Sequence, residues 1–299
     1  EGGLMMRATT MRRPGLSSDA EVLDRVHRVL GPVEVVEDVS PRPKFGRVVR
    51  VETRSGDPCF VKWYRERVDY HREYQALATY TPALGLNAPR LIDNDDELQM
   101  VLISEVPGEP ASRSELAWDP LVHYRAGALI RSLHESAQPV VSDQFSRQCA
   151  DRFEQAASKL EGIVPSPMLA QARLMIARAM DARHVTLVPA HRDNHPGNWM
   201  VDQGGNVRLI DFGSCEYDPW VVDTFVLDHD YWRTDPKLRV AFLGGYDREM
   251  KDEDEALLRA HHAVSAVQGL ALAYSPGSTK ADKRRAWDML DRLLGTTLF

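Results

Sequence analysis

Residues 188–201, VPAHRDNHPGNWMV, place six polar side chains, a proline and a glycine between two apolar flanks. Such a segment predicts an ordered polar loop between packed elements, a place where functional groups concentrate. Its aspartate, Asp193, is followed by Asn198 after five residues and by Asp211 after eighteen. Asp211 ends an apolar run in VRLIDFGSCEYDP (207–219), and we expect the glycine that follows, Gly213, to allow a sharp turn there.

Two carboxylates and a carboxamide are oxygen donors, which suit Mg²⁺ and the phosphates that accompany it. Phosphoryl transfer requires a positioned nucleophile and neutralised phosphate charge. The spacing therefore indicates Asp193 as the group that accepts a proton from an attacking hydroxyl, with Asn198 and Asp211 as ligands of Mg²⁺. A zinc site on His191 and His195 is disfavoured, because no glutamate follows His191 and Pro-Gly would interrupt the helix.

HRDNHPGN followed by IDFG resembles the protein-kinase-like fold, and specifically the aminoglycoside phosphotransferase and choline kinase group, whose pattern is H-G-D-x-H-P-G-N and then I-D-[FW]. The resemblance covers most of residues 33–230, although its specific motifs occupy only about 25 positions. It implies an α+β, two-lobed fold. Residues 18–106 would form a small antiparallel β-rich N-lobe, and residues 107–299 a larger, mainly helical C-lobe. Arg192 departs from the pattern, which has glycine there.

The resemblance also implies nucleotide-binding residues in the N-lobe. Lys62, inside the apolar strand FVKWY, would hold phosphates, and a lysine there needs a counter-charge. Glu73, eleven residues later, is the expected partner. The Ser104 carbonyl and the Val106 amide would contact a purine, and Gly46 is the single glycine of the expected phosphate loop SPRPKFG. Arg42 or Lys44 would supply cations in that loop.

The remaining predicted site residues support the loop or bind the acceptor. We expect His191 to brace the loop by hydrogen bonding, and Asp218 to stabilise the segment after Asp211; Asp223 is interpreted as structural in the same way. Substrate-binding candidates come from VLDHDYW (226–232): Asp228, Asp230 and Trp232.

Apolar periodicity and turn signals predict the elements that must position these residues. Ser18 and Glu21 form a capping-box pattern that opens a helix ended by Gly31. Strands are predicted at 33–39, 47–53, 59–64 and 97–106, the last after a polar turn at 93–97, with a helix at 70–80. After 107–110 the pattern turns helical, at 120–136, 151–163, 168–184, 255–274 and 282–294, with short strands at 199–202 and 207–211. Residues 1–17 are expected to be disordered.

Composition narrows the class of protein. The chain has 299 residues, a net charge of −7 and 43% hydrophobic residues, with no apolar run long enough to span a membrane and no apolar core of a signal peptide. Three widely spaced cysteines indicate a reducing cytoplasm. Residues 201–299 carry 17 acidic and 12 basic residues, which disfavours nucleic acid as a partner and favours a cationic small molecule. Oligomeric state is not encoded in any pattern we recognise.

These observations predict an ATP- or GTP-dependent, Mg²⁺-requiring phosphotransferase that phosphorylates a hydroxyl of a small molecule. An antibiotic is the favoured acceptor. The chain has 30 arginines against 7 lysines, which suggests a GC-rich genome of the kind common among antibiotic producers. The alternatives are a metabolic kinase for choline, homoserine or a sugar, a protein kinase, and a nucleotide-binding pseudokinase. A protein kinase is disfavoured because only seven residues separate Asp211 from Asp218-Pro219 and no A-P-E follows.

Overall fold

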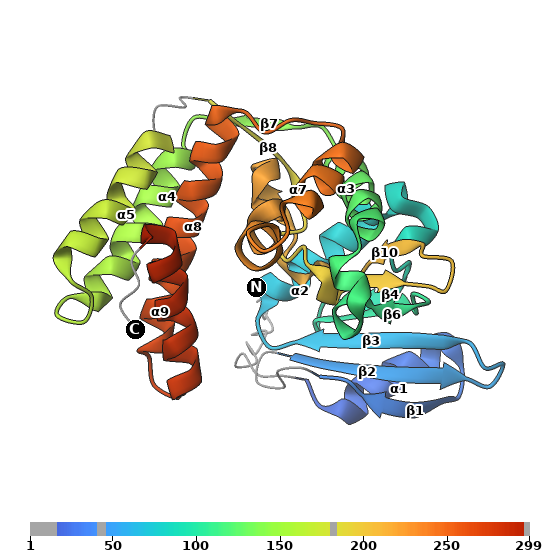
Figure 1. Ribbon diagram of the computed structural model, residues 1–299. Coiled ribbons are helices and arrows are strands. Elements are labelled where there is room, and N and C mark those ends of the chain that lie inside the picture. Colours follow the sequence, from blue (N-terminus) through green and yellow to red (C-terminus); the bar gives the residue numbers. More distant parts are fainter. Residues whose placement is uncertain (1–16, 41–45, 180–183, 296–299) are drawn as a thin grey trace, which may run out of the picture. The chain divides into compact units, whose positions relative to one another are not determined.

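The computed structural model describes residues 17–40, 46–179 and 184–295 (Figure 1). Contacts divide the chain into two compact units. One runs to Val106 and includes Phe212–Ser214; the other comprises Pro107–Asp211 and the chain from Cys215 onward. Nearly all of the segment expected to be disordered, and the expected phosphate-loop cations Arg42 and Lys44, lie outside the described residues.

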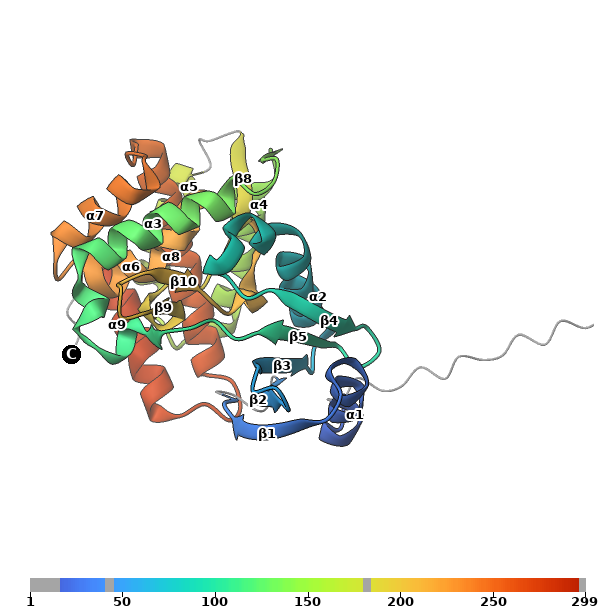
Figure 2. The same ribbon diagram turned by 90° about the vertical axis from the view of Figure 1, so that its right-hand side faces the viewer.

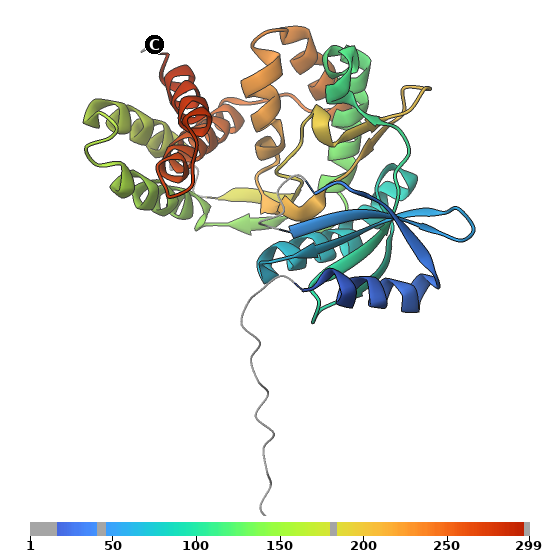
Figure 3. The same cartoon turned by 90° about the horizontal axis from the view of Figure 1, so that it is seen from below.

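The first unit is built on a five-stranded antiparallel sheet in the order β1-β2-β3-β5-β4. Its strands are β1 (Val33–Asp38), β2 (Gly46–Thr53), β3 (Pro58–Tyr64), β4 (Leu91–Asp95) and β5 (Met100–Ser104). Helix α1 (Asp19–Leu30) begins with the predicted capping box and ends at Gly31, whose φ is 76°. Figures 2 and 3 show α1 lying along the sheet.

The period-2 alternation of the strands decides which side chains face which helix. Met100 and Leu102 of β5 pack with α1, whereas Val101 and Ile103 pack on the opposite face with Tyr70 of α2 (Arg67–Gln75). Lys62 of β3 is the direct cross-strand partner of Val101. Lys62 therefore lies on the face of the sheet that α2 covers, because side chains that face α1 alternate along the strand with those that face α2.

Two predicted elements of this unit differ from those observed. The helix predicted at 70–80 starts earlier, at Arg67, and continues past Gln75 as a π-helical turn, Ala76–Tyr80. The polar turn predicted at 93–97 is partly strand, because β4 extends to Asp95. Acidic residues are tolerated on this edge strand since they find partners: Asp93 accepts two hydrogen bonds from Arg25, both 2.9 Å.

The second unit is mainly helical, with two small antiparallel sheets. In one, β10 (Val207–Leu209) and β6 (Glu109–Pro110) flank β9 (Trp199–Val201); in the other, β11 (Glu216–Asp218) and β7 (Val140–Ser142) flank β8 (Val185–Ala190). Helices α4 (Phe145–Ala157), α5 (Ser166–Ala179), α8 (Asp252–Ala273) and α9 (Lys280–Leu294) lie side by side and share one apolar core (Figure 1).

Helices α3 (Pro120–His134) and α7 (Pro236–Tyr246) form the other helical pair of this unit, and the sequence patterns did not indicate α7. Two glycines let their backbones approach closely. A Cβ on Gly245 would lie 1.8 Å from the Tyr124 carbonyl oxygen, and one on Gly127 would lie 2.1 Å from that of Phe242. A short helix, α6 (Phe225–Leu227), completes the unit. None of the helices in the described ranges combines the length and apolarity that a membrane span requires.

Candidate active site

The polar loop lies between β8 and β9, and one buried carboxylate fixes its backbone. Asp223 accepts hydrogen bonds from the main-chain N–H groups of His191 (2.8 Å) and Arg192 (2.5 Å), and its Oδ2 lies 2.8 Å from Nε2 of His134. Burial by itself raises the pKa of Asp223, but the hydrogen bonds from His134 and from the loop reverse this and hold it below its usual range. Asp223 is therefore a charged anchor for the loop.

Arg192, at the position where the family pattern has glycine, adopts a left-handed backbone conformation. Its φ is 65°, a region that disfavours residues with a Cβ. The guanidinium contacts Glu216 (2.5 Å) and Asp218 (3.0 Å), so that side-chain pairing with β11 offsets backbone strain. The departure from glycine is accommodated by an ion-pair network, and the left-handed turn itself is kept.

Asp193 follows this turn, and its half-buried carboxylate is held within the loop. Nδ2 of Asn198 donates to the Asp193 carbonyl oxygen (2.8 Å) and to its Oδ2 (3.1 Å). The imidazole of His195, 3.5 Å from Oδ1, is the main cause of a lowered pKa at Asp193, with burial opposing it. Asp193 is thus ionised at neutral pH and able to accept a proton.

A short hairpin brings Asn198 and Asp211 to the same end of a sheet. Asn198 immediately precedes β9, Asp211 follows β10 by two residues, and the Ile210 N–H donates to the Asn198 carbonyl oxygen (3.1 Å). His191 closes the arrangement, because its Nε2 lies 3.0 Å from the Ile210 carbonyl oxygen. Tertiary pairing thereby joins two positions thirteen residues apart in the sequence.

The expectation that a glycine makes the turn after β10 was wrong. Asp211 itself has the left-handed φ, 66°, and Gly213 is not among the described residues with positive φ. Aspartate tolerates this region better than most residues, because its short polar side chain can bond locally. The turn leaves the Asp211 side chain exposed at the strand end.

These donors fit a magnesium ion that completes its shell with phosphate and water. No three His, Cys, Asp or Glu side chains gather as a metal site within the described ranges. Asn198 uses its Nδ2 on Asp193, which leaves its Oδ1 as the atom that could face a metal ion, and the carboxylate of Asp211 is exposed. Mg²⁺ is commonly bound by one or two protein oxygens together with substrate phosphates, and this donor set is of that kind.

In the first unit, the structure joins Lys62 and Glu73. Nζ of Lys62 lies 2.7 Å from Oε1 of Glu73, both side chains are buried, and the Tyr64 hydroxyl donates to the other carboxylate oxygen. The burial of both charges explains why each requires the other. The role of the pair in phosphate binding stays a prediction.

The other nucleotide-binding candidates have evident structural surroundings. Gly46 starts β2, where a Cβ would lie 2.8 Å from the Trp63 carbonyl oxygen, so close strand pairing accounts for this glycine. Ser104 ends β5, and its hydroxyl accepts a hydrogen bond from the Arg90 N–H (3.0 Å). Val106 is buried at the end of the unit. Their predicted contacts with phosphate and purine remain untested.

Asp218 is the partner of Arg192, so it supports the loop through a side chain and not through the backbone. It is 5% exposed, and burial raises its pKa to about 6 although Arg192 counteracts the effect. Asp223, in contrast, holds the loop backbone directly. Asp218 therefore contacts the loop through the Arg192 side chain, and Asp223 contacts it through the main chain.

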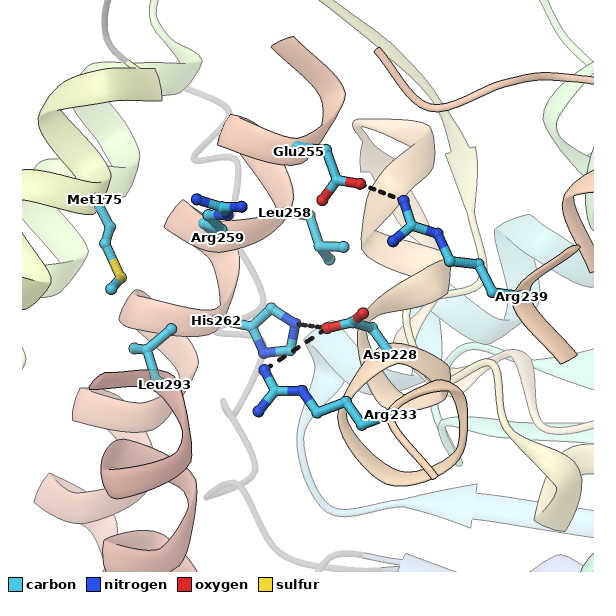
Figure 4. A pocket seen from close by; sticks show the side chains of 9 residues that line it. All are labelled: Met175, Asp228, Arg233, Arg239, Glu255, Leu258, Arg259, His262 and Leu293. Atoms are coloured by element: carbon cyan, nitrogen blue, oxygen red, sulfur yellow. Dashed lines mark hydrogen bonds and ion pairs between the residues drawn. The ribbon is translucent and has the colours of Figure 1, made fainter. Parts of the chain in front are cut away.

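The three substrate-binding candidates have different surroundings. Asp228 lines a pocket of about 300 Å³ in the second unit, shown in Figure 4, whereas Asp230 is exposed and lies 2.6 Å from His229. Trp232 is 3% exposed and packs against Phe242, so it is a core residue and does not line this pocket. Of the three, Asp228 is the one that lines this pocket.

A family model described as the phosphotransferase enzyme family matches residues 46–271. The chain belongs to this family. Its members are phosphotransferases that act on hydroxyls of small molecules, and the kinase-like fold with its five-stranded sheet and helical second part agrees. No curated protein gives a significant sequence match.

Solved structures show the same fold at low sequence identity. The macrolide 2′-phosphotransferase MphH of Brachybacterium faecium has a TM-score of 0.64 at 13% identity, covering 91% of this chain and 97% of that one. The gentamicin complex of APH(2″)-IIa gives 0.64 at 14%, covering 94% and 99%. The amicoumacin kinase hAmiN gives 0.62 at 18%, covering 93% and 94%.

Sequence reasoning missed two residues that order the loop. His134, from α3, contacts both Asp223 and the Tyr246 hydroxyl, each at 2.8 Å. Asn194 donates to the Asp223 carbonyl oxygen (2.7 Å) and accepts from the Trp199 indole (2.7 Å). The position of Asn194 inside the motif was a usable signal, whereas His134, 57 residues before the loop, had none.

Proposed function

We propose that this protein transfers the γ-phosphoryl group of ATP or GTP to a hydroxyl of an antibiotic-like small molecule. The observation that carries the proposal is the loop itself. An ionised Asp193 is fixed by Asn198 and His195, and the Asn198–Asp211 hairpin end presents oxygen donors beside it. In related structures, streptomycin and ATP occupy an APH(2″)-IIa ternary complex, and GDP and kanamycin occupy an APH(2″) complex.

In the proposed step, the acceptor oxygen forms a bond to the γ-phosphorus as its proton passes to the Asp193 carboxylate. The bond between the γ-phosphorus and the β–γ bridging oxygen breaks, and the nucleoside diphosphate leaves with that electron pair. Asn198 and Asp211 would hold Mg²⁺, which neutralises phosphate charge when bound. Lys62, oriented by Glu73, would bind the α- and β-phosphates.

Support for an antibiotic as acceptor is of two kinds. The structural neighbours are described as acting on macrolides or are bound to gentamicin, and they share the fold along almost the whole chain. The arginine-rich composition is typical of GC-rich genomes, and such genomes are common among antibiotic producers. A cytoplasmic location is part of this proposal, since the three cysteines are odd in number and widely spaced in the sequence, which does not suit a disulfide framework. A metabolic kinase for choline, homoserine or a sugar is the alternative.

The test is a transfer assay with the full chain, Mg²⁺, and ATP or GTP against hydroxylated antibiotics, choline, homoserine and sugars. Mass spectrometry would detect the gain of one phosphoryl group, with Asp193→Ala as the control. Product formation by the wild type alone establishes the kinase and names its acceptor class. Nucleotide binding without transfer to any acceptor, or transfer that Asp193→Ala retains, would contradict the proposed mechanism.

A further inference from the structure

The pocket of about 300 Å³ in the second unit has a basic wall within an acidic stretch of sequence. Arg233, Arg239 and Arg259 line it against two acids, Asp228 and Glu255. Residues 201–299 as a whole carry five more acidic than basic side chains. The net charge of the pocket lining is therefore opposite in sign to the net charge of the surrounding chain. The cationic substrate that the overall charge favours does not suit this pocket.

Both acids of the pocket already have cationic or hydrogen-bonding partners (Figure 4). Asp228 lies 3.0 Å from Nε2 of His262 and 3.9 Å from Arg233, and Glu255 pairs with Arg239. Burial raises the pKa of Asp228, but His262 and Arg233 reverse the effect and keep it ionised. The negative charges of the pocket are thus internally compensated, which leaves them poorly suited to attract a cation.

Arg259 is the cation that remains. It projects from α8 between Met175 and Leu258 in Figure 4, and its side chain is exposed. A second hollow of about 310 Å³ shares Met175, Glu255 and Arg259 with the first and adds Arg178 of α5 together with Ala256 and one acid, Asp252. Across residues 17–40, 46–179 and 184–295, no acidic side chain forms an ion pair with Arg259 or Arg178. Two guanidiniums from different helices therefore border one groove.

Chain continuity places this pocket near the catalytic loop. Asp223, which anchors the loop, is followed five residues later by Asp228 through the end of a 3₁₀ turn and α6. At a helical rise of about 1.5 Å per residue, that connection spans about 8 Å. Asp228 then opens a π-helical turn, Asp228–Trp232, a form of backbone frequent at functional sites.

We propose that this pocket binds an anionic group, a carboxylate or a phosphate, on the hydroxylated acceptor, with Arg259 as its principal ligand and Arg178 as a second contact for larger acceptors. The inference rests on the proposed function, because it assigns the substrate class of the same enzyme. A guanidinium matches the planar fork of a carboxylate or phosphate. The acceptor hydroxyl would then point past Asp223, which anchors the loop, toward Asp193.

The experiment uses three matched probes, glucuronate, glucose and glucosamine, whose substituents are anionic, neutral and cationic. Their binding to the full chain is measured by isothermal titration calorimetry, separately from phosphoryl transfer with ATP and Mg²⁺. The variants are Arg259→Gln, Arg259→Lys and a control, Arg284→Gln, which removes an exposed arginine of α9 that lines neither hollow. A charged hydrogen bond of this kind corresponds to roughly tenfold in affinity at its lower range.

Support requires glucuronate to bind about tenfold more tightly than glucose and glucosamine. R259Q must abolish that preference and R284Q must retain it, whereas R259K, which keeps the charge and loses the planar fork, must retain only part of it. Glucosamine bound best, no glucuronate binding, or a preference unchanged in R259Q would each overturn the inference. If R259Q removes glucuronate binding while no acceptor is phosphorylated, the anion site stands and the proposed function fails. If the protein phosphorylates cationic acceptors and R259Q leaves that transfer intact, the proposed function stands and the anion site fails.

Discussion

Replacing Asp218 with asparagine tests how the loop that carries Asp193 is supported. The Asp218 carboxylate is 5% exposed and faces Arg192 at 3.0 Å, yet burial raises its pKa to about 6. Ionised Asp218 is therefore less stable in the folded protein than in the unfolded chain, even with its arginine partner. The amide of asparagine has nearly the same shape and carries no charge to desolvate.

The magnitude follows from linkage between protonation and folding. Relative to an unfolded pKa of about 3.9, a folded pKa of about 6 corresponds to about 3 kcal/mol of lost folding free energy. Because the folded protein holds this proton more tightly, the penalty is fully present above pH 6. It fades as the pH falls through the folded pKa toward the unfolded one. About half of it develops between pH 5 and pH 8.

The assay is denaturant unfolding of the wild type and Asp218→Asn at pH 5 and pH 8. The advantage of the variant should be larger at pH 8 by about 1.5 kcal/mol, and this double difference cancels the titration of all other groups. Glu216→Gln is the matched control, since it removes the more exposed partner of Arg192 and leaves the Asp218 carboxylate in place. A double difference near zero, or one of opposite sign, would refute the assignment of a desolvated, ionised Asp218.

Three further experiments test other parts of the site. Asp193→Ala should lower turnover by about 10²–10⁴ with nucleotide binding preserved, measured by steady-state kinetics and calorimetry, and loss of binding as well would indicate a folding role instead. Glu73→Gln removes the carboxylate that pairs with buried Lys62 and should cost about 3–5 kcal/mol in the free energy of unfolding, whereas the double variant Lys62→Met/Glu73→Leu should recover most of it. Arg192→Gly and Arg192→Ala both remove the guanidinium, but only alanine keeps the left-handed strain, so glycine should be more stable by about 1 kcal/mol in urea unfolding; equal stabilities would contradict the strain at this position.

Much of the fold was readable because local signals agreed with tertiary packing. The capping box at Ser18 and Glu21 located α1 to the residue, and β2 and β3 were found from their β-branched and aromatic runs. The misplaced turn at 93–97 has a physical explanation. Edge strand β4 keeps its acidic residues because Arg25 of α1 pairs with Asp93, a partner 68 residues away that no local pattern contains.

The candidate site was indicated by the sequence for a different reason. Asp193, Asn198 and Asp211 were selected by type and spacing, as the expected base and the expected oxygen ligands on one loop and one hairpin, and these roles stay predictions. The groups that fix them come from distant positions: Asp223 follows the loop, and His134 belongs to α3. Their contribution depends on burial and hydrogen bonding, which exist only once the chain is packed.

From the sequence alone, the kinase-like fold class and the residues expected to act on phosphate followed from the resemblance of HRDNHPGN and IDFG to the motifs of a phosphotransferase family, while periodicity indicated the separate helices and strands. Only the tertiary structure decided what surrounds those residues. It showed that Arg192 takes the left-handed turn of a glycine, and that Asp211, not Gly213, turns the chain after β10. It also revealed a pocket with a basic wall within an acidic stretch of sequence. Net charge counts every residue of the stretch, whereas packing decides which of those residues line the pocket.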